Sequence, residues 1–185
     1  NSTINNWWIG GGFDLTPYMI SNQDSSLWHT EAKLILDEFS KTYYKKFAKN
    51  CDEYFVLPHR KEKRGIGGIF FDQLQHKDID SSLSFLERIA ESYINAYEKI
   101  ILANRNKKFS KADKDFQLYR RGRYVEFNLL FDRGTKFGIE SNGRAESILA
   151  SLPPLVSWPY PNSKIFKKKN KSLISFFNKS WKERL

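Results

Sequence analysis

The sequence predicts an α+β fold, in which helices cover an antiparallel or mixed β-sheet. Three observations lead to this prediction. Short apolar segments beside glycines indicate strands, long segments with a 3.6-residue apolar period indicate helices, and the two kinds alternate irregularly along the chain. A length of 185 residues with 40% hydrophobic residues suits one globular body, and we find no internal repeat or linker. We therefore expect residues 1–185 to form a single domain.

The first part of the chain is expected to form a strand and then helix. Residues 7–15 are predicted as a strand that Gly10, Gly11 and Gly12 interrupt, and the glycines there bring the backbone close to a neighbour. A helical zone of one or two helices should follow from about residue 27 to 55, because Asp24, Ser25 and Ser26 offer N-caps. Its apolar stripe is Leu34, Ile35, Phe39, Tyr43 and Phe47.

A second strand and a long helix are expected next. Residues 64–74 form a short buried strand with a glycine-rich entry. The helix after it is capped by Asp78 or Asp80 and continues to the polar stretch at 104–111. The residues that keep its period are Leu83, Leu86, Ala90, Tyr93, Tyr97 and Ile101.

Residues 116–139 show an apolar period of two and are predicted as a strand pair. Residues 132–135 would supply the turn and residues 136–140 the return strand. A short helix is expected over 144–151, where Pro153-Pro154 stops it. The alternating apolar face is Val125, Phe127, Leu129 and Phe131.

The net charge of +10 is concentrated at the C-terminus, where residues 164–185 hold eight basic side chains and one acidic one. Such a tail could bind nucleic acid or an anionic membrane surface. We favour an amphipathic helix over 171–183 that packs on the body through Leu173, Phe177 and Trp181. Cys51 is the only cysteine, which suits a cytoplasmic protein, and prolines interrupt the longest uncharged stretch, so no membrane span is expected.

Several polar residues are candidates for chemistry. Asp14 ends an apolar strand, so its carboxylate needs a donor, either a ligand N–H group or an internal turn. Arg120 could bind a ligand carboxylate or pair with Glu126. The segment from Asn142 to Arg144 is either an ordinary turn or an anion site at a helix start. The glycine clusters do not complete a nucleotide-binding motif.

Five segments together match one family: 7–17 (WWIGGGFDLTP), 59–72 (HRKEKRGIGGIFFD), 116–129 (FQLYRRGRYVEFNL), 142–149 (NGRAESIL) and 153–158 (PPLVSW). The chain closely resembles oxygen-dependent coproporphyrinogen III oxidases over nearly its whole length, and corresponds to the later, larger part of the family domain. The resemblance implies a flat antiparallel sheet flanked by helices on both faces, usually in a homodimer in the cytoplasm.

The implied reaction converts two propionates of coproporphyrinogen III to vinyl groups, with O2 as co-substrate and hydrogen peroxide as by-product. It implies neither an organic cofactor nor a nucleic-acid partner. Asp14 would be catalytic and bind the pyrrole N–H groups. Asn142, Gly143 and Arg144 match the family's substrate segment, and Arg120 is our further substrate candidate. His29 and His59 match positions that bind a divalent metal in some members, and the stretch from Tyr124 to Pro159 (residues 124–159) matches the dimerisation segment.

The chain departs from the family in two ways. The upstream segment, with a histidine proton donor and further substrate ligands, is absent before Asn1, so we expect an N-terminal truncation with an incomplete pocket. Asn142 stands where many members have glycine, which narrows the allowed backbone conformations. The alternatives are a non-catalytic basic module that binds anionic surfaces or nucleic acid, and a dimerising remnant that binds no tetrapyrrole.

Overall fold

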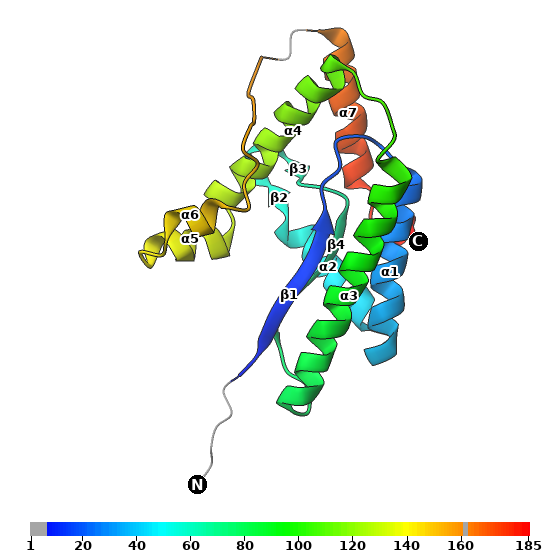
Figure 1. The fold of residues 1–185 in the computed structure, drawn as a ribbon, viewed down its shortest axis with the longest axis vertical. Coiled ribbons are helices and arrows are strands. Elements are labelled where there is room, and N and C mark those ends of the chain that lie inside the picture. Colours follow the sequence, from blue (N-terminus) through cyan, green and yellow to red (C-terminus); the bar gives the residue numbers. More distant parts are fainter. Residues whose placement is uncertain (1–6, 161–162) are drawn as a thin grey trace.

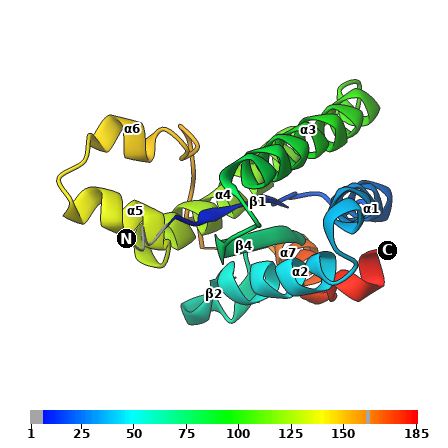
Figure 2. The same ribbon diagram turned by 90° about the horizontal axis from the view of Figure 1, so that it is seen from below.

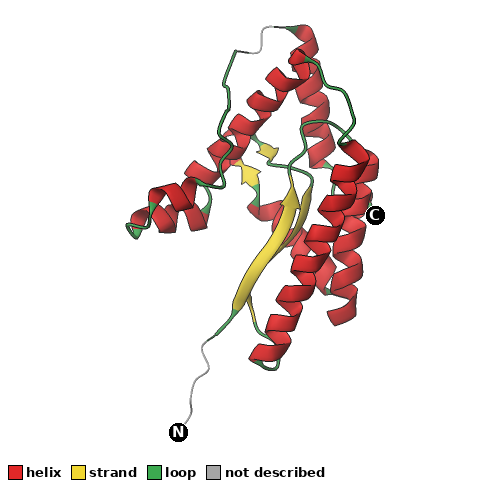
Figure 3. Ribbon diagram, in the orientation of Figure 1, coloured by secondary structure: helices red, strands yellow, loops and turns green. Residues whose placement is uncertain are grey.

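The computed structural model describes residues 7–160 and 163–185 (Figure 1). The predicted α+β class is confirmed, and helices make up most of the chain (Figure 3). The elements are β1 (Ile9–Leu15), α1 (Asn22–Phe39), α2 (Tyr43–Tyr54), β2 (Val56–Leu57), β3 (Glu62–Lys63), β4 (Gly67–Leu74), α3 (Ile79–Asn104), α4 (Lys111–Leu130), α5 (Arg133–Glu140), α6 (Ala145–Leu149) and α7 (Lys164–Asn178), with 3-10 turns at Pro58–Arg60 and Trp181–Arg184.

The central strands β1 and β4 pair antiparallel, with Asp14 opposite Gly68, and β2 pairs with β3 in a second small sheet. Helix α3 covers one face of the β1–β4 pair and α2 the other (Figure 2). A Cβ atom on Gly12 would lie 2.2 Å from the Ile69 carbonyl oxygen. The expectation that glycines bring backbone close together is confirmed, since the two strands approach where side chains are missing.

The first helical zone is two helices, which break at Ser40. Helix α1 begins earlier than predicted, because Oγ of Ser21 accepts a hydrogen bond from the Asp24 N–H at 3.1 Å and is the N-cap. The predicted caps at 24–26 therefore lie inside the helix. The predicted stripe was also partly wrong: Leu34 is exposed, while Trp28 and Leu36 are fully buried.

The long helix α3 has the predicted N-cap Asp78, whose Oδ1 accepts from the Ser81 N–H at 2.8 Å. Its core face, however, is displaced by about one position from the predicted stripe and consists of Phe85, Ile89, Ala96 and Ile100. Tyr93 and Tyr97 remain 41% and 40% exposed. The second half of the predicted stripe, Tyr93, Tyr97 and Ile101, thus lines a pocket instead of the core.

The predicted strand pair at 116–139 is wrong, because these residues form α4 and α5. The segment also carries a helical period, with Phe116, Tyr119, Arg123 and Phe127 buried on one side. A capping box between Ser110 and Asp113 starts α4. The predicted turn at 132–135 is the start of α5, where Asp132 accepts from the Thr135 N–H at 2.7 Å.

The basic C-terminal segment forms α7, which begins seven residues before the expected helix. Leu173, Phe176 and Phe177 are buried in the main core, as an amphipathic helix requires. The predicted short helix before Pro153 is present as α6. Within the described residues, no helix is both long and apolar enough to cross a bilayer.

Candidate active site

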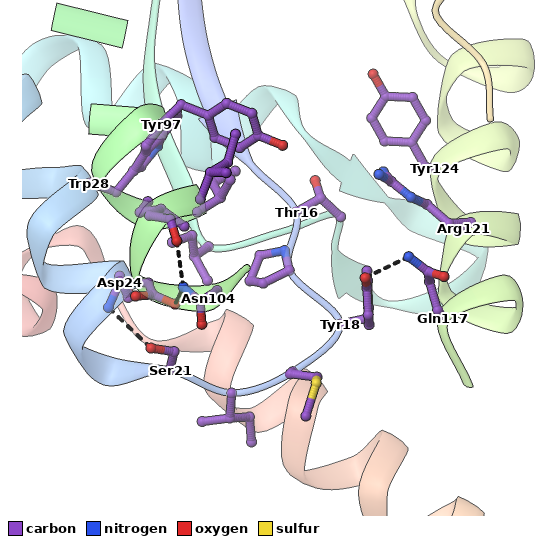
Figure 4. Close-up of a pocket in the computed structure, with 18 of the residues that line it drawn as sticks. Thr16, Tyr18, Ser21, Asp24, Trp28, Tyr97, Asn104, Gln117, Arg121 and Tyr124 are labelled. Atoms are coloured by element: carbon purple, nitrogen blue, oxygen red, sulfur yellow. Dashed lines mark hydrogen bonds between the residues drawn. The ribbon is translucent and has the colours of Figure 1, made fainter. Parts of the chain in front are cut away.

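A pocket of about 1000 Å³ lies between α3 and α4, beside the carboxyl end of β1. Figure 4 shows Trp28 and Tyr97 on one side of it and Arg121 and Tyr124, from α4, on the other. The loop that follows β1 crosses between these walls and contributes Thr16 and its neighbours. The pocket is therefore built from segments that are far apart in the sequence.

Asp14 lies on the pocket wall and forms an ion pair with Arg64. Oδ2 of Asp14 accepts a hydrogen bond from Nη2 of Arg64 at 2.6 Å, and the two side chains are 15% and 6% exposed. Among the described residues, only Arg64 donates to this carboxylate. The second carboxylate oxygen is left to accept a hydrogen bond from a ligand.

Aromatic rings and hydrogen bonds fix the position of the Arg64 side chain. Its guanidinium carbon lies 3.9 Å from the centre of the Phe55 ring and 4.8 Å from that of Phe127, and Nη1 donates to Oδ1 of Asn128 at 3.3 Å. The loop that carries it is pinned to β1, where the Ile66 N–H donates to the Leu15 carbonyl at 2.9 Å. The position of the Arg64 charge is consequently set by the fold rather than by the ligand.

The close contact between the Arg64 loop and β1 depends on Gly65. A Cβ atom on this residue would lie 2.3 Å from the Leu15 carbonyl oxygen, a distance that no side chain tolerates. Gly65, the first glycine of the RGIGG motif (residues 64–68), therefore lets the chain bring Arg64 against the strand that carries Asp14.

One wall of the pocket is aromatic. The rings of Tyr93 and Tyr97 are stacked, with centres 6.0 Å apart and an angle of 8° between their planes. Trp28 meets both rings edge to face. A half-exposed wall of this kind suits a large apolar ligand, since the rings lose little entropy when a ligand covers them.

The opposite wall comes from one face of α4. Gln117, Arg121 and Tyr124 recur at helical spacing and line the pocket. Gln117 also donates to the hydroxyl of Tyr18 across the pocket (Figure 4). The sequence analysis did not predict this face because it treated the segment as a strand, in which Arg121 and Tyr124 point to opposite sides. A helical period of 3.6 residues would have placed them together.

These features agree with the comparisons with known proteins. The family model described as coproporphyrinogen III oxidase matches residues 1–182. The chain belongs to this family. A protein of Francisella tularensis subsp. novicida named oxygen-dependent coproporphyrinogen-III oxidase is 58% identical over 154 residues, which are 83% of this chain and 50% of that protein. The proteins of that name from F. tularensis subsp. holarctica strain LVS and from F. philomiragia are 57% and 55% identical, with the same coverage of each chain.

The chain therefore spans about half the length of the curated relatives it matches. Two of the family motifs meet at the pocket, since residues 7–17 contribute Asp14 and residues 59–72 contribute Arg64. Residues 116–129 supply the α4 wall. The resemblance predicted Asp14 but not its partner Arg64.

The other predicted substrate segment lies elsewhere in this structure. Asn142, Gly143 and Arg144 connect α5 to α6, and none of them lines the pocket. Asn142 has a φ of 57°, and the Gly143 N–H donates to the Gly138 carbonyl at 2.9 Å. Arg144 is 79% exposed and lies 3.8 Å from Glu146. Their substrate role stays a prediction, and within this chain they are exposed and separate from Asp14.

Arg120 is buried and points away from the pocket. Its Nη1 lies 3.2 Å from Oε1 of Glu62 and donates to Oδ1 of Asn170 at 3.0 Å. The ion pair considered from the sequence, with Glu126, is not formed because a helix places Arg120 on a different face. Arg120 therefore ties α4 to β3 and α7, and this geometry gives no support to its predicted contact with substrate.

His29 is fully buried, and both of its ring nitrogens have protein partners. Nδ1 lies 3.0 Å from the Tyr44 hydroxyl and Nε2 lies 3.0 Å from the Ile66 carbonyl oxygen. Burial lowers the pKa of His29 to about 4, although the bond to the Ile66 carbonyl opposes this shift. The histidine is thus neutral at pH 7 and joins α1, α2 and the loop before β4.

His59 lies at the surface, where Nε2 is 2.8 Å from Oε2 of Glu126. Partial burial tends to raise the pKa of Glu126, but hydrogen bonds from Arg60 and His59 outweigh it and hold this pKa at about 2. Within residues 7–160 and 163–185, no three His, Cys, Asp or Glu side chains are grouped to hold a metal. The metal role of His29 and His59 stays a prediction.

The predicted dimerisation segment, residues 124–159, extends from the end of α4 through α5 and α6. Helices α5 and α6 project away from the rest of the chain (Figure 1). Three large apolar side chains of residues 124–159 are exposed: Phe137 of α5 at 72%, and Leu155 and Trp158, which follow α6, at 68% and 53%. Exposed apolar residues on a projecting segment are typical of a surface that another chain covers.

Proposed function

We propose that this chain supplies the pocket of an enzyme that catalyses the O2-dependent conversion of coproporphyrinogen III to protoporphyrinogen IX. The observation that carries the proposal is the Asp14–Arg64 pair on the wall of an aromatic pocket, in a chain of this family. The names of the relatives supply the substrate and the oxidant.

Asp14 has the chemistry that a porphyrinogen requires. The four pyrrole N–H groups of this ligand point to its centre, and a carboxylate with one oxygen unoccupied can accept hydrogen bonds from them. Because the other oxygen accepts a hydrogen bond from Arg64, the carboxylate stays oriented while it binds. Removal of a pyrrole proton by Asp14 would raise the electron density of the ring that is oxidised.

The aromatic wall formed by Tyr93 and Tyr97 would cover one face of the tetrapyrrole. In each half-reaction, a propionate loses CO2 from its terminal carbon and the equivalent of a hydride from the carbon next to the ring. O2 accepts this hydride together with one proton and becomes hydrogen peroxide, and the side chain becomes a vinyl group. The atoms and electrons balance without a flavin or nicotinamide, and we propose O2 as the oxidant with no organic cofactor.

Turnover by the complete polypeptide, as its gene encodes it, tests the proposal. Product should form in air and not under nitrogen, and Asp14→Asn should lower kcat at least about 100-fold, as expected when a group that moves a proton is lost. Asp72→Asn on the paired strand β4, outside the pocket, is the matched control and should retain activity. Equal activity of the two variants, or turnover without O2, would refute the proposal.

We also propose that the enzyme is a cytoplasmic homodimer that uses residues 124–159 as its interface. The support is the exposure of Phe137, Leu155 and Trp158 within residues 124–159, and a single buried thiol, Cys51, as expected in a reducing compartment. Sedimentation analysis of the purified protein tests the dimer. A monomer at micromolar concentrations would contradict it.

A further inference from the structure

We propose that Lys107, Lys108, Lys114 and Arg121 form a carboxylate-binding rim that holds the two propionates that coproporphyrinogen keeps through the reaction. This inference rests on the proposed function, because it assigns ligand groups to one side of the same pocket. None of the five family motifs contains the three lysines, and only the tertiary structure brings them to the pocket that Asp14 also lines.

The four cations come from one stretch of chain. Lys107 and Lys108 lie in the connection between α3 and α4, Lys114 lies in the first turns of α4, and Arg121 lies two turns further along the same helix. All four line the pocket, as Asp14 does. They therefore place positive charge along the part of the pocket that is lined by the α3–α4 connection and by α4, where Figure 4 shows Arg121 beside Tyr124.

The acidic residues of the pocket do not neutralise this charge. Asp14 is paired with Arg64 at 2.6 Å, and Asp113 is paired with Lys169 of α7 at 2.7 Å. Asp24 accepts a hydrogen bond from the Asn104 amide at 3.1 Å. Each carboxylate that lines the pocket already has a donor within the protein.

The four cations, by contrast, have no carboxylate within ion-pair distance in the described part of the chain. Lys114 donates only to the neutral side-chain oxygen of Gln117, at 2.7 Å. The guanidinium of Arg121 lies 5.8 Å from the centre of the Tyr124 ring. A pocket that combines unpaired cations with an aromatic wall matches a ligand with an apolar body and carboxylates at its edge.

The chemistry of the reaction decides which carboxylates these are. A reacting propionate loses its charge as CO2 leaves, so cations that bind it tightly would stabilise the ground state and slow the step. The two retained propionates stay anionic in substrate, intermediate and product. Cations that hold them orient the macrocycle without raising the barrier, and the ligand can then place its reacting side away from the lysines.

The experiment compares the binding of two stable porphyrins to the complete polypeptide. Coproporphyrin III carries all four propionates, and mesoporphyrin IX carries only the two that the reaction retains. The dissociation constants are measured from porphyrin fluorescence for the double variant Lys107→Gln/Lys108→Gln and for Arg121→Gln. The control Lys164→Gln/Lys168→Gln removes the same charge as the double variant from exposed positions of α7, outside the pocket.

We expect the double variant to bind both porphyrins about tenfold more weakly than wild type. The variant Lys107→Arg/Lys108→Arg should restore binding, and the α7 control should not differ from wild type. Weaker binding of coproporphyrin III alone would show that the rim holds reacting propionates and would overturn the inference. Unchanged binding of both porphyrins would also overturn it while leaving the proposed function intact. Wild-type protein that binds neither porphyrin would overturn the proposed function and the inference together.

Discussion

The guanidinium of Arg64 lies 2.6 Å from the carboxylate of Asp14 although the two residues are 50 positions apart in the sequence. The contact joins the carboxyl end of β1 to the loop before β4 at the wall of the pocket. Because both side chains are largely buried, each charge depends on the other for its stabilisation.

Removal of Arg64 should destabilise the protein as well as inactivate it. Arg64→Ala leaves the Asp14 carboxylate largely buried without its cation, and we expect the free energy of unfolding to fall by about 3 kcal/mol. Urea denaturation measures this change. Arg133→Ala is the control, since Arg133 pairs with Asp72 at the surface and its loss should cost less than about 1 kcal/mol. Similar losses for both variants would contradict a special role for the buried pair.

Arg120 should act on stability through Glu62. Arg120→Met removes one cation from a Glu62 carboxylate that is only 3% exposed, and leaves it to Arg123, whose Nε is 3.3 Å away. We expect a loss of about 3 kcal/mol in urea denaturation. The neighbouring Arg121→Gln changes a cation that faces the pocket and should cost less than about 1 kcal/mol. The reverse order of the two losses would show that the helix faces are assigned wrongly.

The stability of the protein should fall as the pH decreases from about 6.5 to 4. His29 is neutral in the folded state, where burial lowers its pKa to about 4, and it accepts a proton more readily when unfolded. The unfolded state therefore binds more protons in this window, and protonation costs up to about 3 kcal/mol of stability.

Urea denaturation at pH 7 and pH 4.5 measures the effect of His29. The variant His29→Gln should have a smaller difference between the two pH values than wild type, whereas His76→Gln should keep the wild-type difference. Glu126 contributes in a separate window, since its pKa of about 2 lies below its usual value and its stabilisation is lost only below about pH 4.5. An unchanged pH dependence of stability in His29→Gln would show that His29 is not the group that titrates between pH 7 and pH 4.5.

Asn142 should tolerate glycine better than any other substitution. Its φ of 57° lies in the left-handed region, which glycine adopts freely and asparagine adopts more easily than most residues. Asn142→Val should lower the free energy of unfolding by about 1 to 2 kcal/mol, and Asn142→Gly should leave it within about 0.5 kcal/mol. Thermal unfolding distinguishes the two. Glu140→Val, two residues earlier at the exposed last position of α5, is the control for the added side chain.

The proposed dimer should depend on residues 124–159. Phe137→Ser combined with Leu155→Ser removes two exposed apolar side chains from residues 124–159, and we expect the dimer dissociation constant to rise at least about tenfold. Sedimentation velocity over a range of concentrations measures it. Leu34→Ser on α1, which removes a leucine that is 60% exposed and lies outside the segment, should leave the proposed dimer intact. Equal dimerisation of all three proteins would locate the interface elsewhere.

Local signals predicted part of the fold correctly. The Asp78 cap of α3, the glycine-rich entry to β4 and the amphipathic character of the basic C-terminal segment each depend on neighbouring residues, and all three are present. The prediction of a strand pair at 116–139 was wrong because the apolar residues there fit a period of two as well as a helical period. Only the partners of Arg123 and Phe127 in the core show which period the chain uses.

By itself, the sequence determined the family, the α+β class and Asp14 as the central candidate, because long motifs and residue types are local properties of the chain. The tertiary structure alone decided that Arg64 holds Asp14, that Arg120 faces the core, and that Arg121 faces the pocket together with Lys107 and Lys108. Contacts between segments 50 or more residues apart depend on how helices pack on the strands. A period read along one segment contains no information about the partner across the pocket.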